Sequence, residues 1–156
     1  MKKNVVDESP REQLNRFLAK YSVEVRSVAR KAIAKLRVRL PGAIELVYDN
    51  YNALAIGFSS SERTADVIVS IALYPRWVSL FFMQGAKLPD PQRLLRGSGK
   101  QVRHIVLGDA IGLDQPAVEA LVGSAIERGK PLPTARGRTT IKSVSARQRA
   151  RRPPSL

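Results

Sequence analysis

Apolar side chains recur at helical spacing in the first quarter of the chain. Two stripes stand out, and the first follows a capping box, Ser9-Pro10-Arg11-Glu12, with proline at the first helical position. The second stripe covers residues 22–39 and ends at Pro41-Gly42. The pattern therefore predicts two successive amphipathic helices. The first stripe consists of Leu14, Phe17, Leu18 and Tyr21, and the second of Val25, Val28, Ala29, Ala32, Ile33 and Leu36.

From residue 43 onward the apolar period changes to two, which is typical of strands. The alternation predicts four strands, and residues 101–107 are a candidate for a fifth. Short turns join successive strands, so we expect antiparallel pairing. A short helix is expected over residues 90–97 and a last one after Asp114, ending before Gly129. The sequence predicts an α+β fold: a meander of four to five antiparallel strands, with N-terminal and C-terminal helices packed on one face.

Charge is distributed unequally along the chain. Lys and Arg number 27 against 13 Asp and Glu, a net charge of +14 over 156 residues. Half of this excess lies in residues 134–156, which hold seven basic side chains and no acidic one. That segment has too few apolar residues to offset the entropy of ordering. We therefore predict a flexible N-terminus over residues 1–8, one α+β domain over residues 9–133 and a basic disordered tail over residues 134–156.

Composition excludes several classes of protein. The chain has no Cys and one His, which excludes disulfide scaffolds, iron–sulfur clusters, thiol nucleophiles and multi-histidine metal sites. No apolar run is long enough to span a membrane, and the first residues lack the apolar segment of a secretory signal. We expect a cytoplasmic protein without membrane association, without a cofactor and without a metal site.

Three short motifs follow the fourth predicted strand. They are Gly85-Ala86-Lys87-Leu88-Pro89-Asp90-Pro91, Gly97-Ser98-Gly99-Lys100 and Arg103-His104-Ile105. In this order they resemble the YdhG-like family of bacterial domains of unknown function, and the resemblance covers roughly residues 12–130. Some members of that family are described as frataxin-like intracellular iron chaperones that bind iron through acidic surface residues. Here the long predicted helix is basic, and hard-oxygen iron binding needs clustered carboxylates. An iron chaperone is therefore the weakest hypothesis.

The candidate chemistry has a structural alternative at each position. The Gly97–Lys100 motif lacks the spacing of a P-loop and favours a tight turn, with an anion-binding nest beside Arg103 as the alternative. His104 has no visible catalytic partners, so a structural role is favoured over a general base. Glu45 and Asp49 share one face of a strand about 13 Å apart, too far for paired catalytic carboxylates. We predict no catalytic residues and favour a non-enzymatic protein.

Aromatic residues are the remaining signal. They can form core or, on an exposed sheet face, a platform for stacking bases, and core is favoured. Trp77 and Phe81 share one side of a strand and Phe82 has the other, so one set is exposed if helices cover only one face. The aromatic set is Tyr48, Tyr51, Tyr74, Trp77, Phe81 and Phe82.

Two main hypotheses for function follow. The first is a domain that binds a small anionic ligand or a protein partner, with ligand-binding candidates Tyr48, Trp77, Lys87, Lys100, Arg103 and His104. The alternative is sequence-independent binding of nucleic acid or another polyanion through the basic helix and the tail. Its candidates are Arg26, Arg30, Arg37, Arg147, Arg149, Arg151 and Arg152. The oligomeric state stays open.

Overall fold

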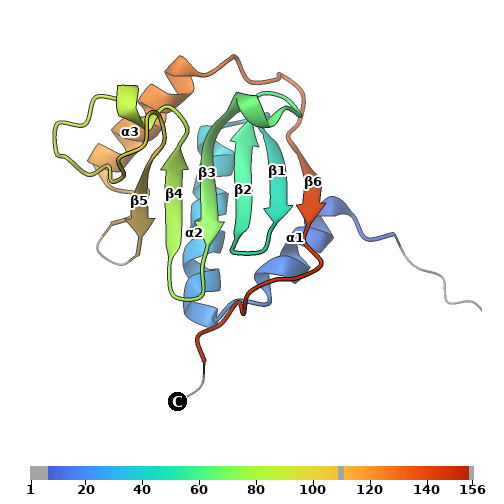
Figure 1. The fold of residues 1–156 in the computed structure, drawn as a ribbon. Coiled ribbons are helices and arrows are strands. Elements are labelled where there is room, and N and C mark those ends of the chain that lie inside the picture. Colours follow the sequence, from blue (N-terminus) through green and yellow to red (C-terminus); the bar gives the residue numbers. More distant parts are fainter. Residues whose placement is uncertain (1–6, 109–110, 155–156) are drawn as a thin grey trace, which may run out of the picture.

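The structure, a computed structural model, describes residues 7–108 and 111–154 (Figure 1). Within these residues the helices are α1 (Pro10–Leu18), α2 (Val23–Arg39) and α3 (Pro116–Arg128), with short 3-10 turns η1 (Thr64–Asp66) and η2 (Gly85–Lys87). The strands are β1 (Ile44–Asp49), β2 (Leu54–Ser59), β3 (Val67–Leu73), β4 (Val78–Phe82), β5 (Arg103–Leu107) and β6 (Arg138–Val144).

Both N-terminal helices begin where the sequence indicates. The Ser9 hydroxyl accepts a hydrogen bond from the Glu12 amide at 3.1 Å, and the Glu12 carboxylate accepts one from the Ser9 amide at 2.8 Å. This reciprocal pair satisfies two amides that the first turn of α1 would otherwise leave without partners. Ser22 caps α2 with a single bond, in which its hydroxyl accepts from the amide of Val25 at 3.3 Å. The predicted capping box and the two helices are confirmed.

The six strands form one sheet in the order β5-β4-β3-β2-β1-β6. Strands β1 to β5 pair antiparallel in chain order, which confirms the predicted meander with its fifth strand. The sixth strand, β6, lies next to β1 and runs parallel to it, so the sheet is mixed. The expectation of a purely antiparallel sheet of four to five strands is therefore only partly met.

Helices cover one face of the sheet. Figure 1 shows α2 and α3 behind the strands, and no helix in front of them. The main core lies in this layer and contains sheet residues Val47, Ile56, Ile71, Leu80, Phe82 and Ile105. Val67 packs with Ile44 and Leu46 on the opposite face, because the pairing of β2 with β3 shifts register at this point. The opposite face carries the smaller cluster of Ile44, Leu46 and Val67, and no helix lies in front of it in Figure 1.

The C-terminal segment is ordered, so the prediction of a disordered tail is wrong for its described part. Strand β6 pairs with β1, and the chain beyond it donates backbone hydrogen bonds from Ser145 to Asp49 and from Arg149 to Tyr51. Arg151 is buried, and its guanidinium donates to the Asp49 carboxylate at 2.9 Å. Local composition indicated too few apolar residues for order. The sheet supplies the missing stabilisation through the backbone groups of β1 and one buried carboxylate.

Residues 90–97 do not form the expected helix. The Asp90 carboxylate accepts hydrogen bonds from the amides of Leu94 and Leu95, each at 2.9 Å, in place of a helical ladder. The chain then pairs Arg96 with His104 as an isolated bridge along the outer edge of β5. Asp114, expected to cap the last helix, forms an ion pair with Lys35 instead, and α3 begins at Pro116. Most of the N-terminus predicted to be flexible, residues 1–6, lies outside the described residues.

A first prediction concerns Tyr21, whose hydroxyl is buried between two strands. It donates to the Leu73 carbonyl at 3.0 Å and accepts from the Leu54 amide at 3.2 Å. Burial raises the pKa of Tyr21 from 10.0 to about 12. The unfolded chain therefore loses this proton first, and the stability that the neutral phenol contributes is lost as pH rises from about 10 to about 12.

We expect Tyr21→Phe to lower the free energy of unfolding by about 1 kcal/mol at pH 7, because the Leu54 amide loses its partner. The difference in free energy of unfolding between the variant and the parent protein should narrow between pH 10 and 12, since the variant has no phenol to ionise. Urea denaturation at pH 7, 9 and 11 measures this gap. A gap that stays constant up to pH 11 would contradict the assigned role of the hydroxyl.

A second prediction concerns Arg151. Its replacement by Ala leaves the Asp49 carboxylate buried without its main partner, and we expect a loss of about 3 kcal/mol in the free energy of unfolding. Arg147→Ala removes an exposed arginine from the same segment and is the matched control, expected to change stability by less than about 0.5 kcal/mol. Equal stability of the two variants in urea would show that the tail is not anchored as described.

Candidate functional site

The hairpin between β3 and β4 presents two aromatic rings at the end of the open sheet face. The amide of Tyr74 donates to the Trp77 carbonyl at 2.9 Å, which closes a turn over Pro75 and Arg76. The rings of Tyr74 and Trp77 stack with centroids 4.7 Å apart and planes 19° apart. Trp77 is 43% exposed, so a large apolar surface faces solvent rather than the core. Strand alternation places both rings on the side away from the helices.

The C-terminal segment forms the other wall of a groove beside these rings. In Figure 1 it crosses beneath the lower end of the sheet toward this hairpin. The Arg149 amide donates to the Tyr51 carbonyl at 2.9 Å, and the Arg152 guanidinium donates to the Lys20 carbonyl at 3.0 Å. The groove measures about 680 Å³. Its lining consists of Asn52, Tyr74, Pro75, Arg76, Trp77, Arg149, Ala150, Arg152, Pro153 and Pro154.

This groove is strongly cationic. Three arginines line it, and no acidic residue does. The Arg152 side chain is held by the last carbonyls after α1, those of Ala19 and Lys20. No carboxylate of a described residue pairs with Arg76 or Arg149. The arrangement therefore combines an exposed ring pair with guanidinium groups that remain available to an anion.

The structure separates the six residues predicted to bind a ligand. In the pairing of β4 with β5, Val78 lies opposite Leu107 and Phe82 lies opposite Arg103. Trp77 is therefore at one end of the sheet and Arg103 at the other. Lys87 lies near the Arg103 end, because the η2 amide of Ala86 donates to the Gln101 carbonyl at 2.8 Å. The predicted residues do not form one site.

The other ligand-binding candidates at the Arg103 end of the sheet either contact residues close to them in sequence or lie apart from one another. One nitrogen of Arg103 donates to the carbonyls of Gly99 at 2.6 Å and Val102 at 2.8 Å, so it braces the loop that precedes its own strand. Gly97 has φ +116, a conformation that favours glycine and fits the tight-turn interpretation of the motif. Lys100 is exposed on this loop. The His104 ring contacts the Phe81 ring on the open face in a tilted arrangement, with centroids 5.3 Å apart.

Tyr48 lies on the open face over β1 and is half-buried. Its hydroxyl forms a short hydrogen bond with the Thr64 hydroxyl, and its ring packs against the cluster of Ile44, Leu46 and Val67. These contacts give Tyr48 a structural role away from the Trp77 groove.

The arginines predicted for nucleic-acid binding fall into different environments. Arg37 forms two hydrogen bonds with the buried Glu45 carboxylate, at 2.6 and 2.9 Å. Arg151 is committed to Asp49, and Arg26 donates to the carbonyls of Ala19 and Tyr21. Arg30 and Arg147 are exposed, whereas Arg149 and Arg152 line the groove. Only part of the predicted set is therefore free to meet a polyanion.

Glu45 and Asp49 do share one face of β1, as expected from their spacing, and both are buried. Each carboxylate forms ion pairs with two cations. Glu45 pairs with Arg37 and, at 3.9 Å, with Arg11. Asp49 pairs with Arg151 and, at 3.7 Å, with Lys20. Across the described ranges, no three residues of the types His, Cys, Asp and Glu come together as a metal site would require.

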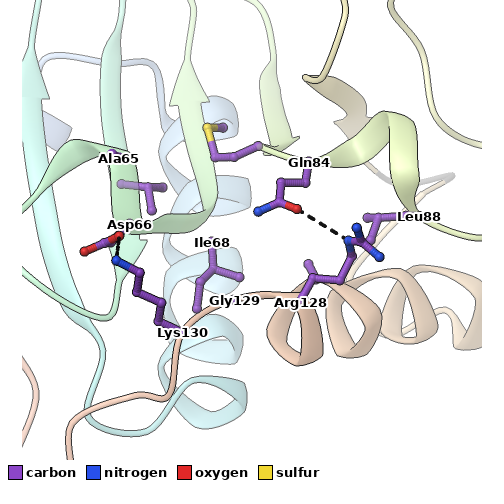
Figure 2. A pocket seen from close by; sticks show the side chains of 11 residues that line it. Ala65, Asp66, Ile68, Gln84, Leu88, Arg128, Gly129 and Lys130 are labelled. Carbon is purple, nitrogen blue, oxygen red and sulfur yellow. Dashed lines mark hydrogen bonds and ion pairs between the residues drawn. The ribbon is translucent and has the colours of Figure 1, made fainter.

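A second, smaller pocket lies near the C-terminal end of α3 (Figure 2). It measures about 180 Å³, and its polar groups are paired across its mouth. Lys130 pairs with Asp66 at 2.9 Å, and Arg128 donates to Gln84 at 3.4 Å. A hydrogen bond from Ser61 and the ion pair with Lys130 lower the pKa of Asp66. Because these charges satisfy one another, the pocket offers less to a ligand than the Trp77 groove.

Sequence reasoning missed the groove because half of it comes from the segment expected to be disordered. Tyr74 and Trp77 were recognised as aromatic candidates, and Arg149 and Arg152 as basic ones, but nothing in the local pattern placed the two pairs together. The available signal in the sequence is the group of three arginines followed by two prolines over residues 149–154.

Comparison of the chain with protein-family models, with curated proteins and with solved structures finds no match. The resemblance to the YdhG-like family stays a prediction. None of the helices in the described part of the chain is long and apolar enough to cross a membrane.

Proposed function

We propose that the protein binds a ligand that combines a flat aromatic ring with phosphate, that is, a nucleotide unit, in the groove beside Trp77. One observation carries the proposal: an exposed, stacked pair of aromatic rings faces arginines in a groove without acidic residues. The proposal joins the small anionic ligand and the nucleic-acid alternative, because both share this chemistry.

The physical argument has two parts. A nucleobase presents a π face, and stacking on an aromatic side chain contributes about 1–3 kcal/mol per base. The Tyr74 ring covers one face of Trp77, so a base stacks on the remaining face or beside the pair. Guanidinium groups match phosphate oxygens in a bidentate geometry, and Arg76 and Arg149 have no carboxylate partner to give up among the described residues.

Binding rather than catalysis is proposed because the groove lining offers few groups for acid–base or nucleophilic chemistry, and burial raises the pKa of Tyr74, its one ionisable hydroxyl. The lining contains no histidine, carboxylate, serine or threonine. General acid–base or nucleophilic chemistry requires such groups within hydrogen-bond reach of the substrate. The iron-chaperone hypothesis, which rests on the family resemblance alone, gains no support from the buried carboxylates, because arginines already neutralise them.

A third prediction tests this function through Trp77, the only tryptophan in the chain. We expect a 5′-mononucleotide to quench the tryptophan fluorescence on binding, because its base stacks on the indole. Ribose 5-phosphate, which lacks the base, should leave the fluorescence unchanged at the same concentration. For Trp77→Ala, nucleotide binding measured by calorimetry should weaken by about tenfold, which corresponds to about 1.4 kcal/mol.

The charged part of the groove has its own matched pair of variants. Arg76→Ala should weaken nucleotide binding severalfold, whereas Arg63→Ala, which changes an exposed arginine outside the groove, should leave it unchanged. Equal binding of inorganic phosphate and nucleotide, together with an unchanged affinity of Trp77→Ala, would contradict the proposal and show that the protein merely attracts anions.

A further inference from the structure

The open face of the sheet is hollow along its middle. Pairing places Gly57, Ser70, Phe81 and His104 in one row across the strands, and Ala55, Ala72 and Ser79 in the next. Small side chains in the centre of a face that no helix covers leave room for a flat ligand. A second groove of about 530 Å³ opens at this position, lined by Asn50, Tyr51, Asn52, Ala53, Ala55, Ser70, Ala72, Tyr74, Phe81 and Ser145.

This sheet-face groove adjoins the Trp77 groove. Asn52 and Tyr74 line both. A ligand that stacks at Trp77 therefore has a direct path over Tyr74 onto the sheet. The two grooves differ in charge: arginines line the first, whereas the second contains no charged residue and offers amides and hydroxyls instead. The first suits a phosphate with its base, and the second suits further bases.

A second aromatic platform stands at the far end of this path. The rings of Phe81 and His104 contact each other with centroids 5.3 Å apart and planes 35° apart, and both side chains are only half-buried. Trp77 and Phe81 lie on the same side of β4, four residues apart, which corresponds to about 13 Å along the strand. Ser79, between them, is small. Bases in a regular strand follow one another at about 3.4 Å, so the two platforms hold bases of different nucleotides.

We propose that the ligand is a single strand of nucleic acid, several nucleotides long, that runs from the Trp77 groove over the open face of the sheet to the Phe81–His104 pair. This inference rests on the proposed function and extends it from a nucleotide unit to an oligonucleotide. Paired bases in a duplex cannot reach an aromatic platform, whereas the splayed bases of a single strand can. The net charge of +14 favours a polyanion of this kind.

The test compares ligands of increasing length on the full chain, with Trp77 quenching as the readout. A mononucleotide, a hexanucleotide and the duplex of the same sequence are titrated at one salt concentration, each in RNA and DNA form. We expect the single-stranded hexanucleotide to bind at least tenfold more tightly than the mononucleotide, and the duplex to bind more weakly than the single strand. The RNA and DNA arms identify the source of the strand.

Phe81→Ala separates stacking from simple charge attraction. We expect this variant to lose most of the extra affinity of the hexanucleotide over the mononucleotide. The mononucleotide should still quench Trp77 fluorescence as in the parent protein. The variant's dependence of affinity on salt should be unchanged, because phosphate contacts set that slope. Phe81→Tyr keeps the ring and should keep the gain in affinity. Val38→Ala, which changes an exposed apolar residue on α2 away from the open face, should behave as the parent protein.

The outcomes distinguish the two levels of the proposal. If no mononucleotide quenches Trp77, the nucleotide-binding function itself fails. If the mononucleotide quenches Trp77 fluorescence but the hexanucleotide binds no more tightly, the extended path over the sheet face is wrong. It is equally wrong if Phe81→Ala, folded by circular dichroism, retains the full gain, or if the duplex binds as well as the single strand.

Discussion

A buried ion pair between Asp49 and Arg151 determines where the C-terminal segment lies. Asp49 is 1% exposed and Arg151 is 6% exposed, and the guanidinium also donates to the Asn50 carbonyl at 2.6 Å. Neither charge is stable in this place without the other, because an unpaired buried ion costs several kcal/mol. The pair therefore fixes the chain that follows β6, and with it one wall of the Trp77 groove.

The arginines differ in whether they form an ion pair with a buried carboxylate. Arg37 pairs with the buried Glu45 and holds α2 against the sheet. Arg151 pairs with the buried Asp49 and holds the C-terminal segment there. Arg76 and Arg149 lie beside the aromatic rings without a carboxylate partner among the described residues. Net charge alone does not distinguish these two roles. Burial and pairing do, and they indicate which cations are available to a ligand.

The two faces of the sheet carry different kinds of side chain, because helices cover only one of them. The helix-covered face holds the large apolar side chains and the compensated ion pairs, which leaves the opposite face free to carry small residues and exposed rings. A face built from Ala55, Ser70 and Ala72 between Tyr74 and Phe81 gains little from packing within the chain. Its shape and composition are better suited to stacking a flat ligand than to filling a core.

Local patterns predicted the elements that depend on neighbours in sequence. The capping box at Ser9, the two helical stripes and the alternation of β1 to β5 are all short-range signals, and each is confirmed. The helix expected over residues 90–97 is wrong because the Asp90 side chain competes for the Leu94 and Leu95 amides, a local contact that periodicity does not report.

The sequence by itself determined α1, α2 and α3, the meander of β1 to β5, and the placement of Trp77 and Phe82 on opposite sides of the sheet. Only the tertiary structure decided that residues 138–144 become a strand and that Arg149 and Arg152 meet Tyr74 and Trp77. That outcome depends on backbone groups at the edge of β1 and on a carboxylate about a hundred residues earlier in the chain. Interactions between residues so far apart in the chain leave no periodic pattern in the sequence, because the partners become neighbours only when the chain folds.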